Sequence, residues 1–237
     1  MNSYPINLDL KNKKVLIIGA GKVAFRKFQR LLETEAEIKI ISPHFNQDFL
    51  PYFKNNLEQY EFIKRKYKKS DLNDVFLVFA ATDNKKVNKN IACLAKKNNI
   101  LINVVDNAEI SDFTLPAVVK RGELLLTVAS GSYLPALSKK IKKRLKNEFG
   151  IEYELLLDVM AEKRNEIIAE IDEISKRRQI FKRLASDQFL QKIKDIAESS
   201  VQNITEKNNL EHRKSELKYF YIKIEAEIDK IIEQIKE

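Results

Sequence analysis

Short apolar runs alternate with amphipathic segments through the first 105 residues of the chain. Runs rich in β-branched residues predict strands at 14–18, 37–41, 60–65, 75–80 and 100–105. Helical spacing of apolar residues predicts helices at 22–33 and 84–97. Strands separated by helices pair in parallel through right-handed crossovers, so this part predicts an α/β fold with a Rossmann-like, doubly wound parallel sheet.

The pattern changes after residue 112. Two apolar runs, at 113–119 and 123–129, flank Arg121-Gly122 and predict a hairpin, and a basic amphipathic helix follows at 135–149. Pro135 suits the first turn of that helix, with Ser132 or a neighbour as its N-cap. We therefore expect a small α+β segment at 113–150, after a first domain at 1–112.

The last 87 residues contain neither glycine nor proline, because all five of each lie at or before residue 150. Such a segment predicts an all-helical domain at 151–237, with Gly150 capping the helix before it. Its apolar residues Leu217, Tyr221, Ile224, Ile228, Ile231 and Ile235 are spaced 4, 3, 4, 3 and 4. This seam covers fewer than three heptads, so packing within a bundle and pairing with another chain both stay open.

Composition and charge narrow the function classes. Hydrophobic residues make up 44% and charged residues 32%, which excludes a disordered chain. Residues 1–150 hold 27 basic and 15 acidic side chains, whereas 151–237 hold 16 and 19, so the first part should attract anions. The basic runs at 64–69 and 139–146 belong to no recognised nucleic-acid fold, and we expect no nucleic acid partner.

Cysteine content and hydropathy indicate the cellular compartment of the protein. The chain has one cysteine, Cys93, no apolar run as long as a membrane span, and no apolar stretch of a signal peptide near residue 1. We therefore expect a cytoplasmic protein with no membrane partner.

A glycine motif joins the first predicted strand to the first helix. Residues 19–24 read GAGKVA and fit G-x-G-x-x-G/A, in which Gly19 permits the tight turn and Gly21 lets backbone amides approach a pyrophosphate. Lys22 and Val23 begin the helix, whose N-terminus favours an anion. The motif predicts a dinucleotide site; the alternative is a glycine turn in a nucleotide-free domain.

Polar residues follow the other predicted strands. After the second strand, Ser42-Pro43-His44 replaces the acidic residue that normally holds the adenosine ribose. Ser42 could bind a ribose hydroxyl, and the choice between NAD and NADP stays open; His44 is more simply a surface loop residue.

The fourth and fifth predicted strands end in further polar residues. Thr82, Asp83, Asn103 and Asp106 should reach the cofactor cleft, because ligands bind beyond the carboxyl ends of parallel strands. Asp83 is equally well explained as the N-cap of the next helix. Asp106 differs because no long helix follows it immediately, and a solvated loop residue is the alternative there.

Four segments resemble the precorrin-2 dehydrogenase family, the first module of siroheme synthases. They read GAGKVAFRKFQRLL, ISPHFN, FAATDNKKVNKNIACLA and NVVDNAEISDFTLPAVVKRGELLLTVASG, and the resemblance covers about residues 5–149. It implies NAD-dependent oxidation of precorrin-2 to sirohydrochlorin, insertion of ferrous iron in some members, and a homodimer formed through 113–149. The family's functional aspartate falls on Asp106, its phosphate-binding glycines on Gly19 and Gly21, and its loop serine on Ser130.

The sequence also departs from that family. Asn107 stands where members often carry a second acidic residue, which weakens the case for iron insertion at Asp106, and we expect no other metal ligand. A tetrapyrrole with eight carboxylates would suit Arg121 and the lysines of the basic helix, Lys139 among them; a solvated helix face is the alternative. In this interpretation Asp106 is the general base.

A second function class is a non-enzymatic NAD(H)-binding sensor that signals through its helical tail. The length of the tail and the replacement of the acidic residue favour it, whereas the paired NVVD and DFTLPA segments favour the enzyme.

Overall fold

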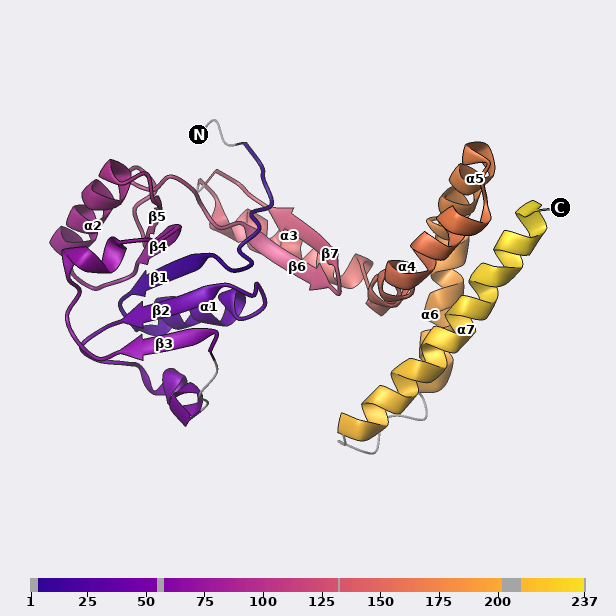
Figure 1. The fold of residues 1–237 in the computed structure, drawn as a ribbon, viewed down its shortest axis with the longest axis horizontal. Helices are drawn as coiled ribbons and strands as arrows, with labels where there is room; N and C mark the ends of the chain where they lie inside the picture. Colours follow the sequence, from indigo (N-terminus) through magenta and orange to yellow (C-terminus); the bar gives the residue numbers. More distant parts are fainter. Residues whose placement is uncertain (1–3, 55–57, 132, 202–209, 237) are drawn as a thin grey trace. The chain divides into compact units, whose positions relative to one another are not determined.

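The computed structural model describes residues 4–54, 58–131, 133–201 and 210–236 (Figure 1). The chain divides into two compact units, Met1–Leu115 and Pro116–Glu237.

The first unit contains a five-stranded parallel sheet with the strand order β3-β2-β1-β4-β5 (Figure 1). Its strands are β1 (Lys14–Ile18), β2 (Glu37–Ile41), β3 (Tyr60–Ile63), β4 (Leu77–Ala80) and β5 (Leu101–Val104). The predicted doubly wound sheet is therefore confirmed. The strand order reverses between β1 and β4, and ligands of such sheets bind at the carboxyl edge beside that reversal.

Two helices cover opposite faces of this sheet. Helix α1 (Lys22–Leu31) packs on Val15 and Ile17 of β1, whereas α2 (Lys85–Lys97) shares a separate core with Leu16 and Ile18. Successive residues of β1 thus pack on opposite faces, which explains why the strand is apolar from Val15 to Ile18. Two short 3₁₀ helices, η1 (Gln47–Lys54) and η2 (Lys69–Leu72), were not predicted.

The second unit begins with the predicted hairpin. Strands β6 (Ala117–Arg121) and β7 (Leu124–Val128) pair in antiparallel fashion around Gly122, whose φ of +54° is left-handed. Helix α3 (Pro135–Glu148) contacts both strands.

Four further helices follow in the described residues of this unit: α4 (Ile151–Glu170), α5 (Ile174–Leu184), α6 (Asp187–Val201) and α7 (Leu210–Lys236). They share one apolar core, to which α7 contributes Ile224, Ile228 and Ile231. The apolar seam of α7 therefore packs within a bundle of the same chain. The side chain of Leu217, the first residue of that seam, lies outside the described residues.

Two predicted helix caps are wrong, at Asp83 and at Gly150. The N-cap of α2 is Asn84 rather than Asp83, because the Asn84 side chain accepts hydrogen bonds from the amides of Lys86 and Val87 at 3.0 and 3.1 Å. Gly150 is the N-cap of α4 with a φ of −88°, so it does not provide a left-handed end for α3. The N-cap of α3 is Leu134, and Ser132 lies outside the described residues.

Candidate active site

A tight turn at Gly19 brings the carboxyl ends of three strands together. Gly19 has a φ of +102°, and its amide donates to the carbonyl of Ile41 at 2.9 Å. A β-carbon at this position would lie 2.3 Å from the carbonyl oxygen of Ala81, directly after β4. The turn predicted from the motif is present, and it requires glycine for both conformation and space.

The start of α1 faces open space. Gly21 is the N-cap, and a β-carbon built there would meet no described atom within 4 Å. In the part of the chain that the structure describes, the amides of Lys22, Val23 and Ala24 have no hydrogen-bond partner, and the first turn holds no acidic residue. Free amides, a helix N-terminus and room for close approach fit a pyrophosphate.

The turn after β2 is closed by Ser42. Its side chain is buried, and Oγ donates to the carbonyl of His44 at 2.6 Å. The hydroxyl proton is therefore engaged within the loop, which leaves only the oxygen lone pairs for a ribose hydroxyl. His44 is exposed, as expected for a loop residue.

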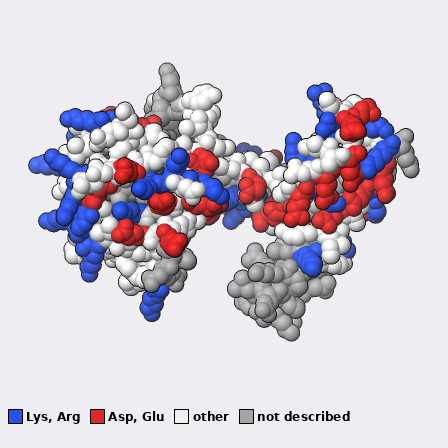
Figure 2. All heavy atoms as spheres, in the orientation of Figure 1, with Lys and Arg blue, Asp and Glu red and all other residues white. Residues whose placement is uncertain are grey.

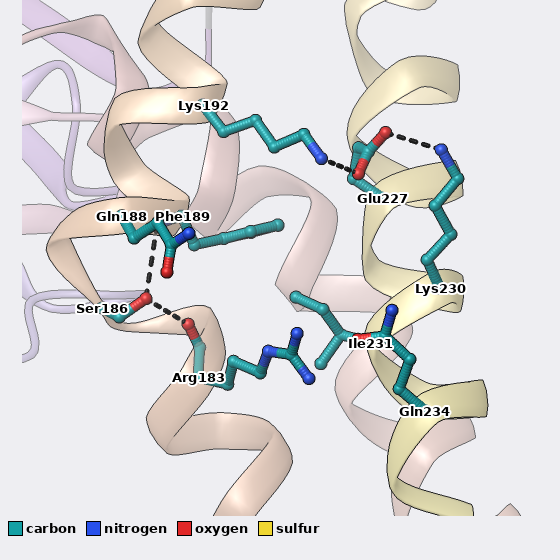
Figure 3. A pocket seen from close by; sticks show the side chains of 9 residues that line it. All are labelled: Arg183, Ser186, Gln188, Phe189, Lys192, Glu227, Lys230, Ile231 and Gln234. Atoms are coloured by element: carbon teal, nitrogen blue, oxygen red, sulfur yellow. Dashed lines mark hydrogen bonds and ion pairs between the residues drawn. The ribbon is translucent and has the colours of Figure 1, made fainter.

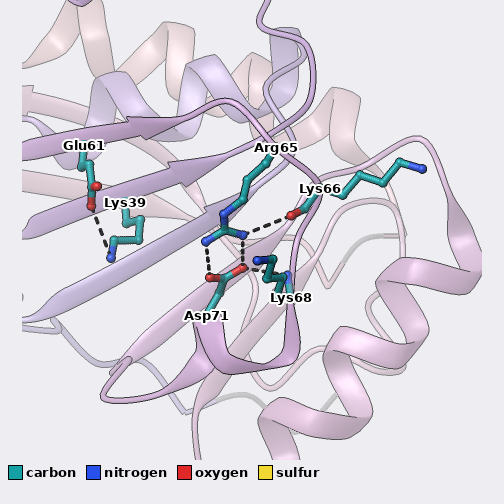
Figure 4. A network of polar contacts seen from close by, with 6 residues as sticks. All are labelled: Lys39, Glu61, Arg65, Lys66, Lys68 and Asp71. Atoms are coloured by element: carbon teal, nitrogen blue, oxygen red, sulfur yellow. Dashed lines mark hydrogen bonds and ion pairs between the residues drawn. The ribbon is translucent and has the colours of Figure 1, made fainter.

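An ion pair fixes the basic loop after β3 (Figure 4). Arg65 donates to both carboxylate oxygens of Asp71 at 2.8 and 2.6 Å, and the amide of Lys68 donates to the same carboxylate at 2.7 Å. The Asp71 side chain is only 7% exposed, and its hydrogen bond with Arg65 is the main reason that its pKa is lowered. This loop thus has a defined shape despite its charge.

The turn after β4 is held by Thr82 and Asn88. The Thr82 hydroxyl donates to the Asn88 side chain at 2.6 Å, and the Asn88 amide donates back to the Thr82 carbonyl at 3.0 Å. The Thr82 side chain is therefore committed to the turn itself. Asp83 is exposed beside it.

Asp106 lies in a turn directly after β5. The amide of Asn107 donates to the carbonyl of Val104 at 3.3 Å, and Asp106 between them has a φ of +58°. The Ser111 hydroxyl accepts from the Val104 amide at 2.9 Å and donates to the Asn107 carbonyl at 2.7 Å. The turn holds an exposed carboxylate in a left-handed conformation that few non-glycine residues adopt.

Lys27 is a buried cation on α1 and was not among the predicted site residues. Its ammonium donates to Oδ1 of Asn103 at 2.8 Å and lies 4.5 Å from the ring centre of Phe79. Asn103 in turn donates from Nδ2 to the carbonyl of Phe113 at 2.9 Å, so its side chain is committed within the protein. The signal in the sequence is a lysine on the apolar stripe of a helix, between Ala24 and Leu31.

The three predicted substrate residues belong to the second unit. Arg121 donates to the carbonyls of Phe149 at 2.9 Å and Lys146 at 3.0 Å, so it caps the end of α3. Ser130 accepts a hydrogen bond from Ser138 at 2.7 Å, at the other end of α3. Lys139 is exposed on the same helix. All the other predicted site residues, Asp106 included, lie in the first unit.

The second unit also has a hollow of about 190 Å³ where α5, α6 and α7 meet (Figure 3). It is lined by Phe189, Arg183, Glu227 and other side chains, and Glu227 pairs with both Lys192 and Lys230. No predicted site residue lines it.

Charge is distributed differently on the two units. Figure 2 shows Lys and Arg side chains gathered at the left edge of the first unit, with some Asp and Glu side chains also visible there, and a band of Asp and Glu side chains over helices of the second unit. Among the described residues, no group of three or more His, Cys, Asp and Glu could hold a metal ion. No described helix is long and apolar enough to cross a membrane.

Comparison with known proteins gives matches to both parts of the chain. Residues 6–117 match a family described as "Putative NAD(P)-binding". The siroheme synthase of Tolumonas auensis is 31% identical over 190 residues, which cover 80% of this chain and 40% of that protein. The siroheme synthase of Pseudoalteromonas atlantica is 32% identical over 207 residues, covering 86% of this chain and 44% of that protein. The chain thus spans about two-fifths of the length of these relatives.

A solved structure of "SirC, precorrin-2 dehydrogenase" has the same fold. It superposes with a TM-score of 0.69 at 24% sequence identity, and the match covers 94% of this chain and 100% of that one. The likeness extends over the helical part as well as the sheet.

Proposed function

We propose that the chain is an NAD-dependent precorrin-2 dehydrogenase, because residues 6–117 match an NAD(P)-binding family and the chain is similar to siroheme synthases. The reaction would convert precorrin-2 to sirohydrochlorin. The observation that carries the proposal is the meeting of two features at one sheet edge. The α1 N-terminus follows β1, the exposed Asp106 carboxylate follows β5, and β4 alone lies between these strands.

The residues at this sheet edge would have two roles, cofactor binding and proton transfer. The turn at Gly19 and Gly21 and the first amides of α1 would hold the pyrophosphate of NAD. Bound NAD supplies the hydride acceptor, since the redox chemistry belongs to the cofactor. Asp106 would take the proton that precorrin-2 loses together with the hydride, which is general base catalysis. The turn between Val104 and Asn107 keeps the carboxylate exposed for that purpose.

The tetrapyrrole carboxylates would meet basic side chains of α3. Lys139, Lys143 and Arg144 are exposed on that helix, and Arg121 anchors its end. A basic surface attracts a polyanion over long range. We propose that Lys139 is one of these substrate contacts, with Ser130 at the start of the helix.

We also propose a homodimer formed through the hairpin and α3. The whole of α3 is described and none of its residues is buried, while Leu125, Leu134 and Leu137 are 45%, 54% and 43% exposed. Apolar side chains gathered on a small segment are typical of an interface. Light scattering of the wild type and of a Leu125→Glu, Leu137→Glu variant should give the mass of a dimer and of a monomer, respectively.

The function is tested with enzymatically generated precorrin-2 and NAD. NADH absorbance and the sirohydrochlorin spectrum should appear together, in equal amounts. Ferrous iron added afterwards is a substrate, and siroheme formed faster than in an enzyme-free control would add iron insertion to the activity. A folded protein that binds NAD but makes no NADH would contradict the proposal and favour the NAD(H) sensor.

A further inference from the structure

Lys27 differs from the other cations of the first unit because its ammonium is buried. The residue is 9% exposed, and its described contacts are the Asn103 side chain and the ring face of Phe79. An ammonium has three donors and is strongly hydrated in water, so one hydrogen bond and one ring face compensate little of the cost of burial. A methionine of similar length would fill the same space without that cost.

Lys27 contacts one end of the loop that carries Asp106, through the Asn103 side chain. Asn103 lies near the end of β5, at the start of this loop, and Phe113 lies at its end. The Asn103 amide accepts from Lys27 with its oxygen and donates to the Phe113 carbonyl with its nitrogen. The Phe113 ring packs on Phe79 with the ring centres 5.8 Å apart, so the ammonium and both loop ends meet around one ring.

We propose that Lys27 is a positioning residue for Asp106. It orients the Asn103 side chain that joins the two ends of the Asp106 loop, and it supplies a positive charge to the Asp106 carboxylate. The catalytic part of this role rests on the dehydrogenase function proposed above. The ammonium also links that loop to α1, the helix whose first turn faces the pyrophosphate site.

The charge on Lys27 is adjustable near neutral pH. Burial is the main cause that lowers the pKa of Lys27 to about 8, and the neighbouring cations Arg30 and Arg26 of α1 lower it further. Asp106 acts in the opposite direction and raises it. The residues that contact the ammonium from β4 and β5, Phe79 and Asn103, carry no charge. Lys27 should therefore lose its proton, and its effect on Asp106, as the pH rises through about 8.

The pH dependence of kcat/KM for precorrin-2 oxidation tests the role. The wild type should lose activity above about pH 8. Lys27→Met should lower the rate at pH 7 by about tenfold and abolish that alkaline decline. Lys27→Arg, which keeps its charge, should retain most of the rate and show no decline near pH 8. Lys89→Met on the exposed face of α2 is the matched control and should reproduce the wild-type profile. A Lys27→Met enzyme with the wild-type rate and profile would overturn the proposal.

A second measurement does not depend on activity. The ε-carbon of ¹³C-labelled Lys27, followed by NMR in the full chain, should titrate near pH 8 and at lower pH in Asp106→Asn. An unchanged titration in Asp106→Asn would overturn the coupling even if the enzyme is active. The wild type could make no NADH at any pH while the Lys27 titration still moves to lower pH in Asp106→Asn. That result would contradict the dehydrogenase function and support the coupling between Lys27 and Asp106.

Discussion

The carbonyl oxygen of Ala81 lies where a β-carbon on Gly19 would have to go, at a distance of 2.3 Å. This oxygen belongs to the backbone directly after β4, and backbone cannot rotate away as a side chain can. Gly19→Ala must therefore move β1 and β4 apart or change a φ of +102°, which costs about 1–3 kcal/mol of unfolding free energy. Urea unfolding should show that loss, and isothermal titration with NAD should show weakened binding.

Gly21→Ala is the matched control for this change. A β-carbon there meets no described atom, and a φ of −81° suits alanine, so the free energy of unfolding should stay within about 0.5 kcal/mol of the wild type. NAD affinity should still fall by about tenfold or more, because the methyl group occupies the space that the pyrophosphate needs. Equal NAD affinity in Gly21→Ala and wild type would contradict the assigned phosphate site.

Asp106→Asn should separate catalysis from binding. Asparagine tolerates a φ of +58° as well as aspartate does, so the turn should persist and NAD affinity should not change. Loss of the proton acceptor should lower kcat by about 10². Asp74→Asn is a matched control, because Asp74 is also exposed with a φ of +58° but precedes β4, at the opposite end of the strand. Similar kcat values for the two variants would remove Asp106 from the role of base.

Substitution of Arg121 should change stability, whereas substitution of Lys139 should change the KM for precorrin-2, although both are basic residues of the second unit. Arg121→Met removes hydrogen bonds to the last carbonyls of α3 and should lower the unfolding free energy by about 1–2 kcal/mol. Lys139→Met removes an exposed charge and should leave stability unchanged while raising the KM for precorrin-2. Thermal unfolding and initial rates check both, and an unchanged KM in Lys139→Met would exclude that residue from substrate binding.

The ion pair between Arg65 and Asp71 should stabilise the first unit in a pH-dependent manner. Asp71→Asn should lower the unfolding free energy at pH 7 by about 1–2 kcal/mol, since the carboxylate accepts three hydrogen bonds. The pKa of Asp71 is lowered in the folded state, so this contribution is complete above the unfolded value and disappears as the pH falls through the folded one. Wild type and variant should therefore converge in acid.

Glu61→Gln is the control for that comparison. Its ion pair with Lys39 is exposed, with 61% of the Glu61 side chain accessible, and should contribute little at any pH. The difference in unfolding free energy between wild type and Asp71→Asn, measured with urea, could instead be independent of pH. That result would show that packing, rather than charge, explains the lower stability of the variant.

Local patterns in the sequence predicted the five strands of the sheet, because each strand is a short segment with its own apolar composition. β1 and β2 begin and end at the predicted residues, since each is a short apolar run bounded by a charged residue and a turn. The cap of α2 was misassigned because Asp83 and Asn84 are adjacent and both favour an N-cap, so only backbone geometry decides between them. Composition alone does not distinguish two neighbouring cap residues.

Roles that depend on distant partners could not be read from the sequence. Arg121 looks like an anion ligand in a basic segment, but its partners are carbonyls formed by the end of α3, 25 and 28 residues later. Lys27 and Asn103 are 76 residues apart, and no spacing rule connects them. A lysine on the apolar stripe of α1 is the signal that could have found this residue, because a lysine that faces the core requires a partner.

Burial of Lys27 also has a consequence for stability that can be measured without substrate. Its pKa is about 8 in the folded protein against 10.5 for the free side chain, so between these values the unfolded chain binds more protons. The unfolding free energy of the wild type should therefore rise relative to that of Lys27→Met as the pH increases, by about 2 kcal/mol between pH 7 and 10. Urea unfolding of both proteins across that range measures the difference. A constant difference would mean that the ammonium is solvated in the folded state, and a falling one would mean that folding raises the pKa of Lys27.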